Sequence, residues 1–196
     1  MGVFRKIFGS STDASKSKTD EKNQSKFLDV DNSPIDEAFT IKFNKNGGKF
    51  LYCENNDEVH DFLNNIIDEN NWDKKKALIL NKNLKEKFKN FKLENVLKKE
   101  IPDFLFTTCE SLIANDGSLL ISSNQIAEKK LIELPENFIV FATTSQFVNT
   151  ISEGLQLIKA KNKSTIPSNI TTIKHFKANE TNDFLSYGSS TKNLYL

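Results

Sequence analysis

Apolar residues occur along this chain in short runs that polar residues interrupt, a pattern typical of alternating strands and helices. Five of these runs are bounded by polar or turn-forming residues and are predicted to be strands: residues 77–80, 103–108, 118–122, 138–142 and 170–173. A further pair is expected near the start of the folded region. Residues 38–43 alternate apolar and polar side chains, and residues 49–53 follow a turn signal with two glycines, so the pair is predicted to be a β-hairpin.

Helical spacing of apolar residues separates these runs. One predicted helix begins at Asn55, Asn56 or Asp57, and the apolar residues of its single face are Val59, Phe62, Leu63, Ile66 and Ile67. Further helical segments are expected over residues 82–91, 93–99 and 110–114, and a long amphipathic helix is expected to start at a Ser145 cap. Strands alternating with helices predict an α/β fold with a largely parallel sheet.

The polar N-terminal segment differs from the rest of the chain. Residues 9–33 hold almost no apolar side chain before Phe27, so burial cannot offset the entropy of ordering them. Residues 1–33 are therefore predicted to be a disordered or loosely attached tail, and residues 34–196, from Pro34 onward, are predicted to be one α/β domain.

Charge argues against nucleic acid as a partner. The chain has 27 basic and 26 acidic residues, for a net charge of +1, and all basic residues except Arg5 are lysines. Arginine is the preferred bidentate reader of phosphate and guanine, so a domain without it is a poor candidate for sequence-specific binding. An anionic ligand would have to be held by lysine, hydroxyl or backbone N–H groups.

Cofactor and metal motifs are absent from the sequence. Cys53 and Cys109 have no partner at metal-binding spacing and are expected to be free thiols in a reducing compartment, and His60 and His175 are expected to be ordinary side chains. No glycine-rich nucleotide loop and no run of about 20 apolar residues occurs. The chain is accordingly expected to be cytoplasmic, with no cofactor, no metal and no membrane span.

Polar turns beside the predicted strands are the candidate ligand site, because ligands of α/β proteins bind at the carboxyl ends of strands. Three turns supply the candidate ligand-binding residues, which are Gly117, Ser118, Thr144, Ser145, Gly188, Ser189, Ser190 and Thr191. Each also has a plainer explanation: Ser145 as a helix cap, and residues 188–191 as a flexible polar turn. Their convergence on one anion is a hypothesis that the spacing leaves open.

Glu110 and Asp116 are the candidate catalytic residues. Glu110 could act as a nucleophile or base if it lies beside a substrate. The alternative for Glu110 is a carboxylate at a helix start, and the alternative for Asp116, next to Gly117, is an ordinary turn residue.

Several segments resemble the LUD domain of bacterial lactate utilization proteins. Residues 113–121 (Ile-Ala-Asn-Asp-Gly-Ser-Leu-Leu-Ile) are similar to the family's Ile-Ala-x-Thr-Gly-Thr/Ser segment, and residues 134–140 are similar to its Leu-Pro-x-x-His-Ile-x-Val. Residues 145–148 resemble the helix start that follows, and residues 188–191 resemble the start of Gly-Pro-Ser-Arg-Thr-Ala-Asp-Ile. Asp116 stands at the usual threonine, Ser189 at the proline, and the motif arginine is missing.

This resemblance implies a fold similar to ribose-5-phosphate isomerase and CoA transferases, with a mostly parallel sheet between helices. It also implies an accessory or ligand-binding role in the use of L-lactate or a related hydroxy acid, beside iron–sulfur partner proteins and with a small anionic ligand. Two alternatives stay open at this point. One is an enzyme acting on a phosphorylated sugar or CoA ester with Glu110 or Asp116 as base, and the other is a non-catalytic interaction protein whose tail recruits a partner.

Overall fold

The computed structural model describes residues 33–72, 75–91, 93–96, 101–176 and 192–196. Five parallel strands form the larger sheet, which we call sheet A. Its spatial order is β2 (Glu94–Asn95), β1 (Lys76–Leu78), β3 (Phe104–Thr107), β6 (Asn137–Val140) and β9 (Asn193–Tyr195). The predicted tail, residues 1–33, lies outside the described residues except for Ser33.

A second, mixed sheet, which we call sheet B, has the order β7 (Phe147–Val148), β4 (Ser111–Ile113), β5 (Ser118–Ile121) and β8 (Thr171–Ile173). β5 runs antiparallel to both β4 and β8, whereas β7 runs parallel to β4. The helices are α1 (Ile35–Lys45), α2 (Asn56–Glu69), α3 (Lys82–Lys87), α4 (Ser123–Ile126) and α5 (Ile151–Lys161). Short 3₁₀ turns occur at η2 (Lys89–Phe91), η3 (Leu131–Glu133) and η4 (Thr144–Gln146).

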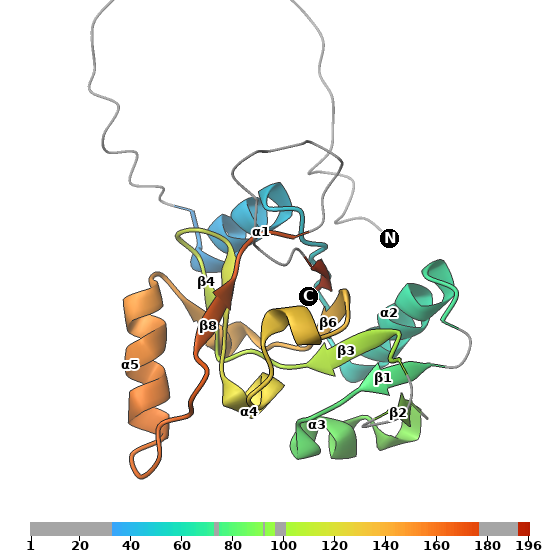
Figure 1. Ribbon diagram of the computed structural model, residues 1–196. Coiled ribbons are helices and arrows are strands. Elements are labelled where there is room, and N and C mark those ends of the chain that lie inside the picture. Colours follow the sequence, from blue (N-terminus) through green and yellow to red (C-terminus); the bar gives the residue numbers. More distant parts are fainter. Residues whose placement is uncertain (1–32, 73–74, 92, 97–100, 177–191) are drawn as a thin grey trace, which may run out of the picture. The chain divides into compact units, whose positions relative to one another are not determined.

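Side chains alternate between the two faces of sheet A, and each face has its own core. Phe104 and Phe106 of β3 pack with α2 and α3 in one cluster, while Leu105 lies in the other cluster with α1 and sheet B. The outer face of sheet B packs against α5 through Leu120 and Ile158. Sheet A therefore lies between layers, and α5 covers the far side of sheet B (Figure 1).

The hairpin predicted over residues 38–53 is wrong, because its first half is helix α1. Phe39 and Phe43 are fully buried four residues apart, whereas Ile41, which a strand would place beside them, is 58% exposed. Acidic Asp36 and Glu37 occupy the first turn and lysines the last, as the helix dipole favours.

The second half of that predicted hairpin pairs with the end of the chain instead. The Lys49 amide donates to the Leu194 carbonyl at 2.9 Å, and the Leu51 amide donates to the Leu196 carbonyl at 2.6 Å. A parallel bridge joins Lys49 to Tyr195, so this segment lies beside the outer edge of β9.

Three other sequence-based elements differ from the structure. Residues 94–95 form β2, which replaces part of the helix predicted over 93–99, and residues 111–113 form β4 in place of a helical turn. Ser145 does not cap the long helix: it lies in η4, β7 follows, and Thr150 is the cap of α5, accepting from the Glu153 amide at 3.2 Å. The helix at 56–69 and the five predicted strands are confirmed within one to three residues at each end.

Candidate functional site

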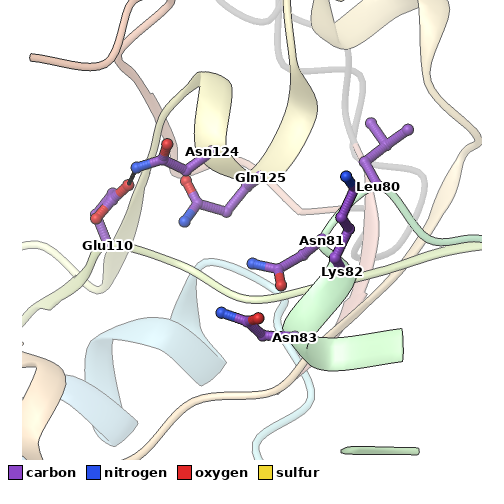
Figure 2. A pocket seen from close by; sticks show the side chains of 7 residues that line it. All are labelled: Leu80, Asn81, Lys82, Asn83, Glu110, Asn124 and Gln125. Carbon is purple, nitrogen blue, oxygen red and sulfur yellow. Dashed lines mark hydrogen bonds between the residues drawn. The ribbon is translucent and has the colours of Figure 1, made fainter. Parts of the chain in front are cut away.

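A cleft of about 500 Å³ lies beside the carboxyl ends of β1 and β3, where ligands of parallel sheets usually bind. Segments that follow β1, β3 and β5 line it, with the side chains of Leu80, Asn81, Lys82, Asn83, Glu110, Asn124 and Gln125 (Figure 2). All but Leu80 are polar or charged. The lining thus favours a ligand that is recognised by hydrogen bonds.

Glu110 is fixed at one wall of this cleft. Its Oε1 accepts from the Ser122 hydroxyl at 2.6 Å and from Asn124 Nδ2 at 2.9 Å. Its backbone amide donates to the Leu120 carbonyl at 2.7 Å, so the start of β4 holds the main chain in place. Among the residues that the structure describes, Oε2 has no hydrogen-bond partner. One carboxylate oxygen is therefore held, and the other is available to a ligand.

Ser122 connects Glu110 to Gln125. Ser122 is fully buried at the N-cap of α4, where its hydroxyl accepts from the Asn124 amide at 3.1 Å. Its own amide donates to Gln125 Oε1 at 2.8 Å, which completes a capping box. The capping box therefore positions the side chains on both sides of the cleft wall.

Gln125 presents its amide nitrogen to the cleft. An N–H can only donate, so the bond from the Ser122 amide identifies the bonded atom of Gln125 as oxygen and leaves Nε2 on the other side. The residue is 4% exposed, and within the described part of the chain Nε2 has no partner. Figure 2 shows this nitrogen directed into the hollow.

The opposite wall is the start of α3. Asn81 caps this helix, because its Oδ1 accepts from the Leu84 amide at 3.0 Å, and its Nδ2 remains as a donor. Lys82 and Asn83 are exposed at the rim. Lys82 and Glu110 are the two charged residues of the lining, and their formal charges cancel.

Gln146 holds the turn after β6 against the segment after β3. Its Nε2 donates to the Cys109 carbonyl, while its Oε1 accepts from the Thr143 amide at 2.8 Å. Cys109 is 4% exposed, and burial raises the pKa of its thiol to about 12. The thiol therefore stays protonated near neutral pH and is unsuited to nucleophilic chemistry.

Comparisons with known proteins show the family and the fold of this chain. The LUD domain profile matches residues 37–193, most of the chain. The chain belongs to the LUD domain family. Its structure is also similar to the crystal structure of a DUF162 family protein from Deinococcus radiodurans, with a TM-score of 0.54 and 12% sequence identity over 82% of this chain and 94% of that one. Comparison with curated proteins gives no match. The expected family and the α/β fold class are confirmed.

Glu110 is the candidate residue that this LUD domain places in the cleft. Asp116, Gly117 and Ser118 lie at the opposite end of the β4–β5 hairpin, and the four residues of β5 span roughly 13 Å. Asp116 Oδ1 accepts there from the Ser118 amide and hydroxyl, and Lys174 Nζ lies 3.7 Å from Oδ2. This is the geometry of a turn residue.

The remaining predicted residues do not line the cleft of this LUD protein, or lie outside the described part. Thr144 and Ser145 are exposed in η4, where the Ser145 hydroxyl lies 2.9 Å from that of Thr143. Residues 188–191, the family's glycine–serine segment, are outside the described residues. Convergence of all three polar turns on one ligand therefore stays a hypothesis.

Sequence reasoning missed most of the cleft's polar residues. A polar run directly after a predicted strand was the signal used for the other turns. The predicted strand at 77–80 has the same signal, since it is followed by Asn81, Lys82 and Asn83. Asn124 and Gln125 follow the predicted strand at 118–122, and the pattern Ser122-x-x-Gln125 is the capping-box signal that identifies a helix start there.

Cys53 and Cys109 are both free thiols, as expected. In the described ranges, no three His, Cys, Asp or Glu side chains gather closely enough to hold a metal ion. No helix of those ranges has the length and apolar character needed to span a membrane.

Proposed function

We propose that this protein is an accessory, ligand-binding member of the LUD family that serves the use of L-lactate or a related hydroxy acid. It acts in the cytoplasm beside iron–sulfur partner proteins and holds a small anionic ligand in the cleft between Asn81 and Glu110. Family membership supports the metabolic role, and the polar lining of the cleft supports ligand binding.

The observation that carries the binding role is a pair of polar atoms without partners in the described part of the chain. Glu110 Oε2 and Gln125 Nε2 both belong to lining residues, and Gln125 is nearly fully buried. Both atoms face the cleft, so a ligand that carries a donor and an acceptor can bond to them in place of solvent.

A thermal-shift series tests the binding role. L-lactate and related hydroxy acids are expected to raise the melting temperature of the wild-type protein, since a ligand of the folded state stabilises it. Lys82→Met should reduce that shift by removing the cationic lining residue, and Lys159→Met, on α5, is the matched control that should keep it. No shift with any hydroxy acid would contradict the binding role.

A deletion strain tests the metabolic role. Loss of the gene is expected to slow growth on L-lactate as sole carbon source, with growth restored by the wild-type gene, and the tagged protein is expected to retain cysteine-rich iron–sulfur proteins on purification. Unchanged growth on lactate would count against this role even if the purified protein binds a hydroxy acid.

A second candidate is an enzyme that acts on a phosphorylated sugar or a CoA ester with Glu110 as base or nucleophile. Two observations favour it: Glu110 is fixed with one oxygen open to the cleft, and the cleft volume is in the range that accommodates larger ligands. Turnover of such a compound by the wild type, lost in Glu110→Gln, would establish this function in place of the first.

A further inference from the structure

We infer that the cleft selects a ligand hydroxyl over the corresponding carbonyl group, and that Glu110 and Gln125 together make this selection. The inference rests on the proposed function, because it concerns the same cleft. The inference concerns the chemical group of the ligand that faces Glu110 and Gln125, the two side chains that Ser122 holds in place.

Glu110 contributes a hydrogen-bond acceptor to this selection. Both of its neighbours, the Ser122 hydroxyl and the Asn124 amide, donate to Oε1, an arrangement that suits a carboxylate. An ionised carboxylate can accept but cannot donate. Oε2 therefore offers the ligand only lone pairs, and it needs a donor opposite.

Gln125 contributes a hydrogen-bond donor. The Ser122 amide holds Oε1 at 2.8 Å, so the side chain cannot turn its oxygen toward the cleft without leaving a buried N–H unbonded. Nε2 therefore offers only hydrogen atoms. Ser122 thus positions one acceptor and one donor on the wall of the cleft. Figure 2 shows these two side chains, Glu110 and Gln125, beside each other.

A hydroxyl group meets both requirements, since it donates one hydrogen bond and accepts others. It can donate to Glu110 Oε2 and accept from Gln125 Nε2. A keto oxygen can accept from Gln125, but it has no hydrogen to donate. Its lone pairs would face those of Glu110 Oε2, which would stay without a hydrogen bond. The keto acid would therefore lose the hydrogen bond to Oε2 that the hydroxy acid makes.

The charges of the lining orient a hydroxy acid in the cleft. A ligand carboxylate beside Glu110 would be repelled by the like charge, whereas Lys82 offers the opposite charge on the α3 wall. The hydroxyl is therefore assigned to the Glu110–Gln125 side, and the ligand carboxylate to the part of the cleft that lies away from Glu110. A hydroxyl of a phosphorylated sugar has the same chemistry, so the test includes one.

Isothermal titration calorimetry with L-lactate and pyruvate tests the inference, because the two acids share size and charge and differ in this group. Wild-type protein is expected to bind L-lactate about 10- to 100-fold more tightly than pyruvate. In Glu110→Gln an amide N–H can donate to the keto oxygen, and the preference is expected to fall to within about threefold. Glu133→Gln, an exposed residue outside the cleft, makes the same chemical change and should keep the wild-type preference.

Lys82→Met provides a second variant, since an exposed rim residue can be replaced without disturbing the fold. It is expected to weaken both acids to a similar extent and leave their ratio unchanged. A ratio that falls in Lys82→Met as far as in Glu110→Gln would overturn the assignment of the hydroxyl to Glu110.

The outcomes separate the inference from the proposed function. Equal affinity of the wild type for both acids would overturn the hydroxyl selection while the binding role stands. No binding of either acid would contradict the proposed function itself. Binding of D-ribose 5-phosphate alone, lost in Glu110→Gln, would support selection of a hydroxyl but transfer it to a phosphorylated sugar, against the hydroxy-acid role.

Discussion

Ser122 is the residue on which the candidate site depends most. It is fully buried, it bonds to Glu110 through its hydroxyl, and it bonds to Gln125 through its amide. Gln125 follows Ser122 by three residues, but Glu110 precedes it by twelve and falls in a predicted helical turn. The sequence identified Glu110 by its chemistry alone. Its contacts with Ser122 and Asn124 could not be predicted, because they require the start of α4 to lie beside the start of β4.

Ser111 provides a prediction on stability. Its hydroxyl is fully buried and, within the described residues, has no hydrogen-bond partner. Ser111→Ala removes this unmet group, so the free energy of unfolding is expected to rise by about 1 kcal/mol. Urea denaturation measures it, with Ser118→Ala as the matched control, because that buried hydroxyl bonds to Asp116 and its loss should destabilise the protein. A destabilised Ser111→Ala would contradict this account.

Cys109 provides a prediction on pH dependence. Burial raises the pKa of its thiol from 9.0 to about 12, so the folded state keeps the proton while the unfolded state loses it above pH 9. The contribution of the thiol to stability is therefore complete below pH 9 and is lost as the pH rises toward 12. Between pH 9 and 10 the loss is about 1 kcal/mol.

Urea denaturation of the wild type and Cys109→Ala at both pH values isolates this effect. The variant should be less stable than the wild type at each pH, because the substitution leaves a cavity. From pH 9 to pH 10, however, its free energy of unfolding should fall by about 1 kcal/mol less than that of the wild type. The same slope in both proteins would show that Cys109 is not protected by burial.

At the scale of elements, the β4–β5 hairpin shows where the predicted Gly117 turn lies relative to the cleft. The Gly117 turn was expected at a ligand crevice, but it packs on the C-terminal end of α1, where Asn46 Nδ2 donates to the Asp116 carbonyl at 2.7 Å. The predicted helical turn at 110–114 left no partner for the strand at 118–122. The antiparallel pairing of β4 with β5 directs the turn away from the carboxyl ends of β1 and β3.

Gly117→Ala is expected to be strongly destabilising. Gly117 has φ +67°, and a Cβ there would lie 2.4 Å from the Phe43 backbone nitrogen, which cannot move without shifting α1. The expected cost is about 2–4 kcal/mol in the free energy of unfolding.

Gly154→Ala is the matched control. Its Cβ would lie 2.9 Å from the flexible end of Leu120, and alanine is the better helix former by about 1 kcal/mol. This variant should therefore lose much less stability than Gly117→Ala. Similar losses in the two variants would show that the turn tolerates a side chain.

Helix α1 shows why element type was misassigned at the start of the domain. Phe39, Ile41 and Phe43 fit the two-residue period of a strand, and Phe39 and Phe43 also fit the four-residue spacing of a helix. A run of six residues does not separate the two periods. The acidic first turn and lysine-containing last turn favoured the helix, and burial of both phenylalanines against the sheets decides it.

At the scale of the whole molecule, the three central strands of sheet A were predictable and the sheet edges were not. Each of β1, β3 and β6 is an apolar run bounded by polar or turn-forming residues, and the sequence predicts all three as strands. β2 has two residues and β9 three, and each becomes a strand only by pairing with a distant neighbour. Sheet B was also missed as a separate sheet, because only pairing distinguishes its β5 and β8 from the strands of sheet A.

The expected division of the chain gives a prediction at this scale. We propose that residues 34–196 fold and bind ligand without residues 1–33. A protein starting at residue 34 is expected to match the full chain within about 0.5 kcal/mol in urea denaturation and to give the same thermal shift with ligand. A loss of several kcal/mol would place part of the stabilising core before residue 34. A loss of partner binding alone would favour a recruiting role for those residues.

The most direct test of the central claim, that the cleft beside Glu110 binds a hydroxy acid, is a titration of ¹⁵N-labelled protein with L-lactate followed by NMR. The account predicts the largest shifts at the side-chain amide of Gln125 and at the backbone amides of Glu110 and Asn124, with no change at Gly117. Shifts that gather at the Gly117 turn, or no shifts at any concentration up to tens of millimolar, would contradict it.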